Sequence, residues 1–443
     1  MWMLIGLLGC GGKNTETGTV DSSEALGFTP DIPTSSCGTE SYSWLPTDQM
    51  GSLIEVEDVD ELSLSKETIN ILLEQLGVGA LAPVPYDVKT YRIRYLTQNR
   101  GQEIEATGLV TLPDGMESAA PPLLWTHPTT GFTDECAPSA QGLEGAGFPI
   151  LWAALGYAVA APDYLGMAGW GEPSGMLHPY VTAEPTAIAS LDALRAMDNL
   201  IVDREPELSL AKDKTIFWGA SEGGYAALMS DRYRPHYLPD FTGAATVAAI
   251  PATNLPELAR LSMLELHDST FGLLAVLATQ AEWYGGSVSL SDAAIPEFAT
   301  EVESMLLQCE DFGAADGISS VEEIYQADFI EAAINGDWDA VSPWGCYLSE
   351  NSLTLSPIPI DTPSPTLIIT AENDDLALPA PVREDIVTLC TAGYTIEHRE
   401  CAGANHVAGA RDTLESQLAW IAQRVNGTSL GETCVIQAPS ECD

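Results

Sequence analysis

One serine stands between two glycines in a segment that could support nucleophilic catalysis. Residues 216–224 contain the pattern G-x-S-x-G, with Ser221 at its centre. The apolar residues 215–218 predict a buried strand before the pattern, and residues 225–229 predict a helix after it. A sharp turn between such elements strains the serine backbone and projects its hydroxyl above the sheet. We therefore predict that Ser221 is a nucleophile, and a glycine-rich connection with an incidental serine is the weaker interpretation.

A serine hydroxyl needs a base that takes its proton. When the serine follows a strand in this way, the partners come later in the chain, first an acid and then a histidine. Of six histidines, only His398 and His406 lie late enough. His398 falls inside an alternating strand pattern, where we expect it at the surface. His406 follows that strand in a loop of small residues, so we predict that it is the base.

The acid is expected in residues 371–375, the loop that leaves a predicted strand at 366–370. A carboxylate there could orient the histidine and stabilise its protonated ring. Counting from the end of the strand favours Asp374, whereas counting back from the following Leu-Pro favours Asp375. We choose Asp374 because the path from a rigid strand varies less, and Asp375 stays the alternate acid.

Backbone N–H groups should stabilise the oxyanion that forms during acyl transfer. The first donor is expected to be Glu222, which follows the nucleophile and opens the predicted helix. The second should come from the loop after the strand at 122–126. Pro128 has no N–H in that loop, so Thr129 or Thr130 must donate.

The elements around these residues predict an α/β fold. Short apolar runs at 122–126, 157–161, 215–218, 244–250 and 366–370 are typical of buried parallel strands. They alternate with helical patterns, which favours a mostly parallel, doubly wound sheet. Between residues 251 and 350 the strand signal fades and helical patterns follow one another. We expect a helical cap there, inserted between the core segments 41–250 and 351–443.

A resemblance to a known family is carried by residues 127–139, 156–164, 178–180 and 191–196. These segments resemble the secretory lipase family of the α/β-hydrolase superfamily. The resemblance covers roughly residues 85 to 425 and includes a helical insertion where that family has its lid. It implies the α/β-hydrolase fold, esterase or lipase activity on a small ester or lipid, and no cofactor or metal. A peptidase or amidase on the same fold, or a binding module without turnover, stays open as an alternative.

Charge narrows the possible partners. The chain has 64 acidic residues and 17 Lys plus Arg, which gives a formal net charge of -47. The acidic residues are spread along the chain, and such a surface repels phosphates at long range. We therefore expect no nucleic-acid partner, and the oligomeric state is left open.

The first residues resemble an export signal. Residues 1–10 form an apolar run that ends in Leu-Leu-Gly-Cys and resembles a bacterial lipobox, in which Cys10 would be lipidated. Residues 11–40, rich in Gly, Ser, Thr and Pro, predict a flexible tether. We expect a secreted or cell-envelope lipoprotein of a bacterium, which Cys10 could attach to a membrane.

The other eight cysteines suit four disulfides in an oxidising compartment. Sequence alone leaves their connectivity open. From their spacing, plausible pairs are Cys390 with Cys401, Cys434 with Cys442, and Cys309 with Cys346.

Overall fold

A single mixed sheet organises the chain in the computed structural model, which describes residues 28–76, 78, 81, 83–285, 288–309 and 317–442. Its described strands form one sheet in the order β1-β2-β3-β5-β4-β6-β7-β8-β9. The strands are β1 (Leu53–Asp58), β2 (Asp87–Asn99), β3 (Gln102–Asp114), β4 (Pro122–Thr126), β5 (Ala158–Pro162), β6 (Thr215–Ala220), β7 (Gly243–Ala249), β8 (Thr366–Ala371) and β9 (Ile396–Cys401).

The sheet is mostly parallel, as its sequence predicts. Strands β5, β4, β6, β7, β8 and β9 pair in parallel, whereas β1, β2, β3 and β5 pair antiparallel. Every residue of β4, β5 and β8 is buried, because helices cover both faces of these central strands. The carboxyl ends of the parallel strands therefore meet at one edge, where side chains from distant parts of the sequence come together.

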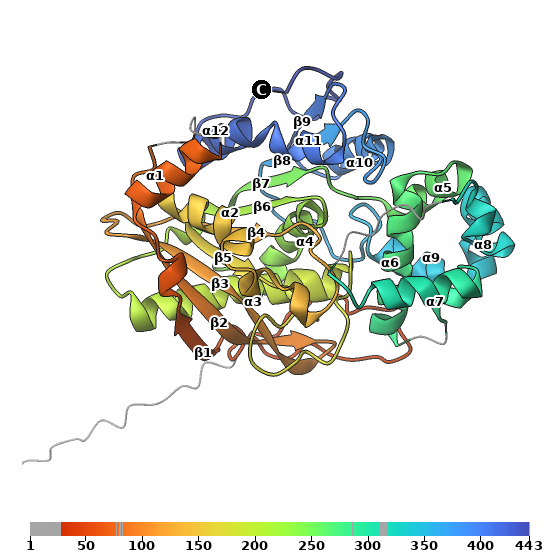
Figure 1. The fold of residues 1–443 in the computed structure, drawn as a ribbon, viewed down its shortest axis with the longest axis horizontal. Coiled ribbons are helices and arrows are strands. Elements are labelled where there is room, and N and C mark those ends of the chain that lie inside the picture. The colour runs from red at the N-terminus through yellow and green to blue at the C-terminus, as the bar shows by residue number, and fades with distance from the viewer. Residues whose placement is uncertain are drawn as a thin grey trace, which may run out of the picture.

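Helices cover both faces of the sheet (Figure 1). One core cluster joins the sheet to α3 (Ala183–Arg204), α4 (Glu222–Tyr237) and α10 (Pro379–Thr391). A second cluster joins the other face to α1 (Lys66–Gln75), α2 (Leu143–Ala154) and α12 (Leu414–Val425). The short helix α11 (His406–Arg411) follows β9. These layers make the doubly wound arrangement that the alternating pattern indicates.

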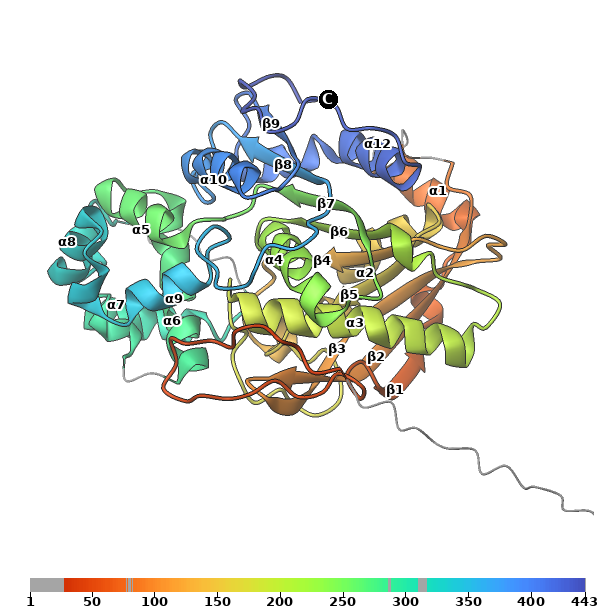
Figure 2. The same cartoon turned by 180° about the vertical axis from the view of Figure 1, so that it is seen from behind.

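In the described part of the chain, five α-helices lie between β7 and β8, within the segment 251–350 in which the sequence predicts a cap. They are α5 (Leu255–Leu264), α6 (Asp268–Tyr284), α7 (Pro296–Met305), α8 (Ala327–Asn335) and α9 (Trp344–Glu350). Figure 1 and the reverse view in Figure 2 both show them gathered at one side of the sheet-and-helix body. The successive helical patterns that the sequence shows in this segment thus correspond to helices in the structure.

The segment 28–40 is not the flexible tether that its composition predicts. Cys37 is disulfide-bonded to Cys346 at the start of α9, and the backbone N–H of Ser36 donates to Glu350. Ile32 is buried in the main core cluster. The covalent and polar contacts explain the difference, since they fix a chain whose small polar residues alone would leave it mobile. Residues 1–27, with Cys10 and the rest of the predicted tether, lie outside the described residues.

Eight cysteines form four disulfides, as their even number predicts, but the pairing differs from the pairs suggested by spacing. The bonds join Cys37 to Cys346, Cys136 to Cys309, Cys390 to Cys434 and Cys401 to Cys442. The pairs Cys390–Cys401, Cys434–Cys442 and Cys309–Cys346 are therefore wrong. Three-dimensional proximity decides connectivity, and two of the bonds span 309 and 173 positions that no local pattern relates.

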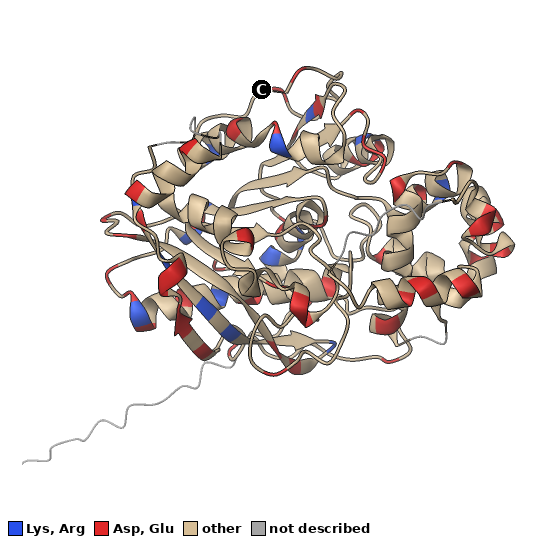
Figure 3. Cartoon of the chain, viewed as in Figure 1, with Lys and Arg blue, Asp and Glu red and all other residues tan. Residues whose placement is uncertain are grey.

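Acidic side chains are distributed over both the sheet-and-helix body and the cap (Figure 3). They form no single tail or block within the described residues. None of the described helices has the length and apolar character that crossing a membrane would require.

Candidate active site

Ser221 occupies the turn between β6 and α4. Its backbone has φ of 57° and ψ of −122°, a conformation that costs a non-glycine residue free energy. The N–H of Ser221 donates to the carbonyl of Ala249 at 2.8 Å, which ties the turn to the end of the neighbouring strand β7. The neighbouring strand thus holds the strained turn and keeps the serine at the carboxyl edge of the sheet.

The glycines of the G-x-S-x-G pattern are required by close backbone approach. A Cβ atom on Gly219 would lie 2.2 Å from the carbonyl oxygen of Gly223, and one on Gly223 would lie 2.1 Å from that of Thr126. Neither clash can be relieved by rotating a flexible side chain, because backbone atoms are involved. The pattern therefore reports the tight packing of the turn against β4, as its sequence context predicts.

The structure brings together the three side chains that the sequence singles out. The Oγ of Ser221 lies 2.8 Å from Nε2 of His406, which opens α11. On the other side of the ring, Nδ1 lies 2.8 and 2.9 Å from the two carboxylate oxygens of Asp374. The Asp374 carboxylate is buried and also accepts hydrogen bonds from the N–H groups of Leu376 and Ala377. These bonds fix the carboxylate and thereby the orientation of the imidazole.

Asp375, the alternate acid, has an exposed side chain, and no hydrogen bond joins it to His406 within the described residues. Its carbonyl instead accepts a 2.9 Å hydrogen bond from the N–H of Ser269 in the cap helix α6. The preceding residue, Asp268, has a raised pKa, first because of its partial burial and then because of the nearby Asp375 carboxylate. The first turn of α6 therefore stands beside the loop that carries Asp374, a contact that the sequence did not reveal.

Within the described residues, the N–H groups of the predicted oxyanion donors have no protein acceptor. As the first residue of α4, Glu222 has no intrahelical acceptor for its N–H. In the described part of the chain, the N–H groups of Thr129 and Thr130 donate to no protein acceptor. The hydroxyl of Thr129 donates to Tyr180 at 3.0 Å, and the neighbouring His127 is buried, which lowers its pKa.

His398 is buried, which corrects its predicted place at the surface. Only 3% of its surface is exposed, because residues near the C-terminus cover β9. Its Nδ1 accepts from the N–H of Gln437, and its Nε2 lies 3.0 Å from the hydroxyl of Thr370. Burial lowers the pKa of His398 to about 4, so the ring stays neutral in ordinary conditions. The sequence pattern predicted the strand, but no pattern predicted that the chain near Gln437 packs over it.

A pair next to the nucleophile escaped the sequence analysis altogether. The carboxylate of Glu222 turns inward, and its Oε1 lies 2.5 Å from Nε2 of His178. Both side chains are 1% exposed. His178 lies in the loop before α3, 44 positions away. The only available signal was a histidine in a family-like segment, and nothing in the sequence joins it to Glu222.

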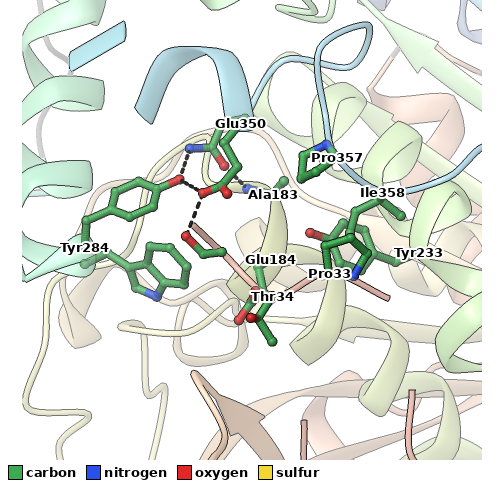
Figure 4. Close-up of a pocket in the computed structure, with 12 residues that line it drawn as sticks. Pro33, Thr34, Ala183, Glu184, Tyr233, Tyr284, Glu350, Pro357 and Ile358 are labelled. Carbon is green, nitrogen blue, oxygen red and sulfur yellow. Dashed lines mark hydrogen bonds between the residues drawn. The ribbon is translucent and has the colours of Figure 1, made fainter. Parts of the chain in front are cut away.

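A small cavity lies elsewhere, between the N-terminal segment, α3, α4 and the cap (Figure 4). Its volume of about 10 Å³ gives room for about one water molecule. Glu184 and Glu350 are among its lining residues, and Oε1 of Glu184 is buried without a hydrogen-bond partner in the described structure. Neither Ser221 nor His406 lines this cavity, so it is separate from the candidate active site.

Comparison with known proteins agrees with this arrangement. The sequence model of the family described as secretory lipase matches residues 149–311, a segment that includes Ser221. The overall fold is shared with solved hydrolase, esterase and lipase structures. The chain has the α/β-hydrolase fold. Its expected resemblance to the secretory lipases is confirmed.

Three solved structures illustrate how far this α/β-hydrolase fold is shared. A Legionella pneumophila protein described as a hydrolase candidate is 21% identical, with a TM-score of 0.71 over 86% of this chain and 100% of that chain. The rice cell wall degrading esterase LipA from Xanthomonas oryzae is 19% identical, with a TM-score of 0.67 over 85% and 97%. Candida antarctica lipase A in its closed state is 16% identical, with a TM-score of 0.64 over 88% and 86%. No curated protein matches the chain.

Proposed function

We propose that this protein hydrolyses carboxylic esters through an acyl-enzyme formed on Ser221. In this proposal Ser221 attacks the ester carbonyl while His406 takes the hydroxyl proton, and Asp374 stabilises the imidazolium. The C–O bond to the alcohol then breaks, and the alcohol leaves with the proton held by His406. Water, activated by the same histidine, hydrolyses the acyl-enzyme and frees the serine.

One observation carries the proposal, the hydrogen-bonded chain from Ser221 through His406 to Asp374. Its two links are 2.8 Å long, within the range that proton transfer needs. The strained backbone of Ser221 supports the same role, because strain is retained where it positions a reacting group. Asp374 is preferred to Asp375 because only Asp374 contacts His406.

The oxyanion would lie in front of α4, where the N–H of Glu222 and one N–H from Thr129 or Thr130 could donate. The positive end of the α4 dipole adds to this stabilisation. Residues 251–350 would act as a cap over the acyl group, with 41–250 and 351–443 forming the catalytic core. No step requires a metal or an organic cofactor.

The substrate class rests on similarity. The chain resembles secretory lipases, and it shares its fold with an esterase and a lipase. Both classes act on esters of carboxylic acids, so a small ester or a lipid is the proposed substrate. The four disulfides are consistent with an extracellular protein. We further propose export as a lipoprotein anchored through Cys10.

Hydrolysis of p-nitrophenyl esters of increasing acyl length by the wild type and by Ser221→Ala tests this function. We expect the wild type to be active and the variant to lose several orders of magnitude in kcat/KM. Amides that share the same acyl groups separate an esterase from an amidase. A folded wild type that cleaves amides and not esters would reject the ester assignment, and one that cleaves neither would favour a binding module.

A further inference from the structure

The nucleophile is followed by a carboxylate that is sealed inside the protein. Glu222 is only 4% exposed, although it opens a helix at the edge of the sheet where solvent and substrate would arrive. A bare negative charge one residue from Ser221 would oppose the oxyanion that forms during acyl transfer, since like charges repel strongly in a dry site. The environment of this carboxylate therefore bears on the reaction itself.

Hydrogen bonding determines how many protons the Glu222–His178 pair holds. The Nδ1 of His178 lies 2.9 Å from the carbonyl oxygen of Leu165. A carbonyl only accepts, so this nitrogen carries a hydrogen. The 2.5 Å contact between Nε2 and Oε1 of Glu222 needs one further proton between the two atoms. The pair is thus either an acid with a neutral imidazole or a carboxylate with an imidazolium, and its net charge is zero in both forms.

Among the described residues, the other titratable side chains that face Glu222 carry no charge that could balance it. The titratable side chains that face it are His127, Tyr164, Tyr180 and Tyr225. Burial lowers the pKa of His127, and burial raises the pKa of each tyrosine, so all four are neutral around pH 7. The second oxygen of Glu222, Oε2, is buried and has no hydrogen-bond partner in the described structure. The proton shared with His178 is therefore what neutralises this carboxyl group.

The pair also connects the first turn of α4 to the loop that follows β4. The ring of Tyr164 stacks on His178, with centroids 5.3 Å apart, and on His127, with centroids 4.1 Å apart. The hydroxyl of Tyr164 donates to the carbonyl of His127 at 3.0 Å. The N–H of His178 donates to Phe132 in the same loop at 2.9 Å. The two sides of the proposed oxyanion hole thus share one buried framework.

We propose that Glu222 and His178 are positioning residues for acyl transfer, which aim the N–H of Glu222 and keep one proton beside the oxyanion. This inference rests on the proposed function of Ser221. It assigns two tasks to the pair. The hydrogen bond fixes the helix terminus, and the shared proton keeps the site free of a second negative charge. The variants described below separate these tasks, because an amide can keep a hydrogen bond while it cannot supply the charge.

The test compares H178Q, E222Q and the double variant H178Q/E222Q. In H178Q the amide can donate to Glu222 but cannot become cationic, so the carboxylate loses its compensating charge. We expect kcat to fall about 10–100-fold at pH 8 with KM changed less than about threefold, because the uncompensated carboxylate would oppose the oxyanion. The double variant restores a neutral, hydrogen-bonded pair and should recover at least about tenfold of the lost kcat.

A buried histidine elsewhere serves as the matched control. His398 is as well buried and lies on β9, where it contacts Thr370 and Gln437 rather than the nucleophile. H398Q should leave kcat, KM and the pH profile near those of the wild type. Thermal unfolding of all variants separates a loss of stability from a loss of rate.

The outcomes distinguish this inference from the function on which it rests. Wild-type turnover together with an unchanged kcat and pH profile in H178Q would overturn the inference alone. Equal losses in H178Q and in the double variant would overturn the role of the shared proton. A folded wild type without ester turnover would reject the proposed function, and the inference with it.

Discussion

The Oγ of Ser221 lies 2.8 Å from Nε2 of His406, although the two residues are 185 positions apart in the chain. The strand-to-helix turn at the end of β6 supplies the serine, and the first residue of α11 supplies the histidine. Parallel strands that end at one edge of the sheet make this meeting possible. The same geometry places Asp374 beside His406. It predicts that mutations of adjacent residues have different effects on activity.

Asp374 and Asp375 are adjacent acids with opposite expected effects. Asp374→Asn should lower kcat/KM by about 10³–10⁴-fold, because an amide cannot hold the imidazole in the required form or stabilise its cation. Asp375→Asn should change kcat/KM by less than about threefold, because its side chain is exposed and does not contact His406. Steady-state kinetics on one ester measures both. A larger loss in the Asp375 variant would assign the acid to the other residue.

The turn between β6 and α4 tolerates no side chain at Gly223. Gly223→Ala should destabilise the protein by about 2 kcal/mol or more and abolish most activity, since its Cβ would lie 2.1 Å from the carbonyl of Thr126. Gly147 in α2 is the control, because a Cβ there meets no atom within 4 Å. Gly147→Ala should raise the unfolding free energy by about 0.5–1 kcal/mol through its helix propensity. Chemical denaturation compares the two, and similar effects of both changes would contradict the packing described for the turn.

The Cys136–Cys309 disulfide joins the loop after β4 to the cap, where Cys309 lies just after the end of α7. Replacement of both cysteines by serine should lower the unfolding free energy by about 2–4 kcal/mol and accelerate amide exchange in residues 127–136 and 296–309. The matched control is the double serine variant at Cys390 and Cys434, whose bond lies in the C-terminal part of the chain. That control should leave exchange in the cap unchanged. Equal acceleration there in both variants would show that the first bond has no specific effect on the cap.

Stability should fall as pH rises through the range in which Glu184 ionises. Glu184 lines the cavity shown in Figure 4, and its burial is the main cause that raises its pKa from 4.5 to about 7. Folding therefore favours the protonated acid. The stability that the protonated form of Glu184 provides is fully present below pH 4.5 and is lost as pH rises to about 7. The free energy of unfolding falls by on the order of 3 kcal/mol over this range.

Glu184→Gln tests this dependence, because glutamine keeps an acceptor for the hydroxyl of Tyr42 and does not ionise. Relative to the wild type, the variant should gain stability at pH 8 and show no such gain at pH 4.5. Glu331→Gln on the exposed surface of α8 should show no such difference. Thermal melts at the two pH values measure the effect. An equal shift at both pH values would mean that the ionisation of Glu184 does not cause it.

The sequence predicted much of the core because its signals are local. A buried run before G-x-S-x-G and a helix after it located Ser221, and the loop after the strand at 366–370 located Asp374. Strand β4 was predicted with the bounds that it has in the structure. Such signals depend on the few residues on either side, so they survive without knowledge of the rest of the fold.

The missed features depend on contacts between distant residues. The Glu222–His178 pair spans 44 positions, and the Cys37–Cys346 bond spans 309. His398 was expected at the surface because its strand alternates, but the chain near Gln437 covers it. The residues around His398 show that it lies in a strand, but they do not show which distant segment packs over that strand. Burial by a segment far away in the sequence therefore has no local signature.

Covalent trapping of the nucleophile tests the central claim most directly. A fluorophosphonate or a slowly deacylating ester is incubated with the wild type, Ser221→Ala and His406→Ala, and the adduct is located by peptide mass spectrometry. The account predicts one adduct per chain on Ser221, none in Ser221→Ala, and labelling slowed by several orders of magnitude in His406→Ala. An adduct on another residue, or ester turnover that persists in Ser221→Ala, would contradict it.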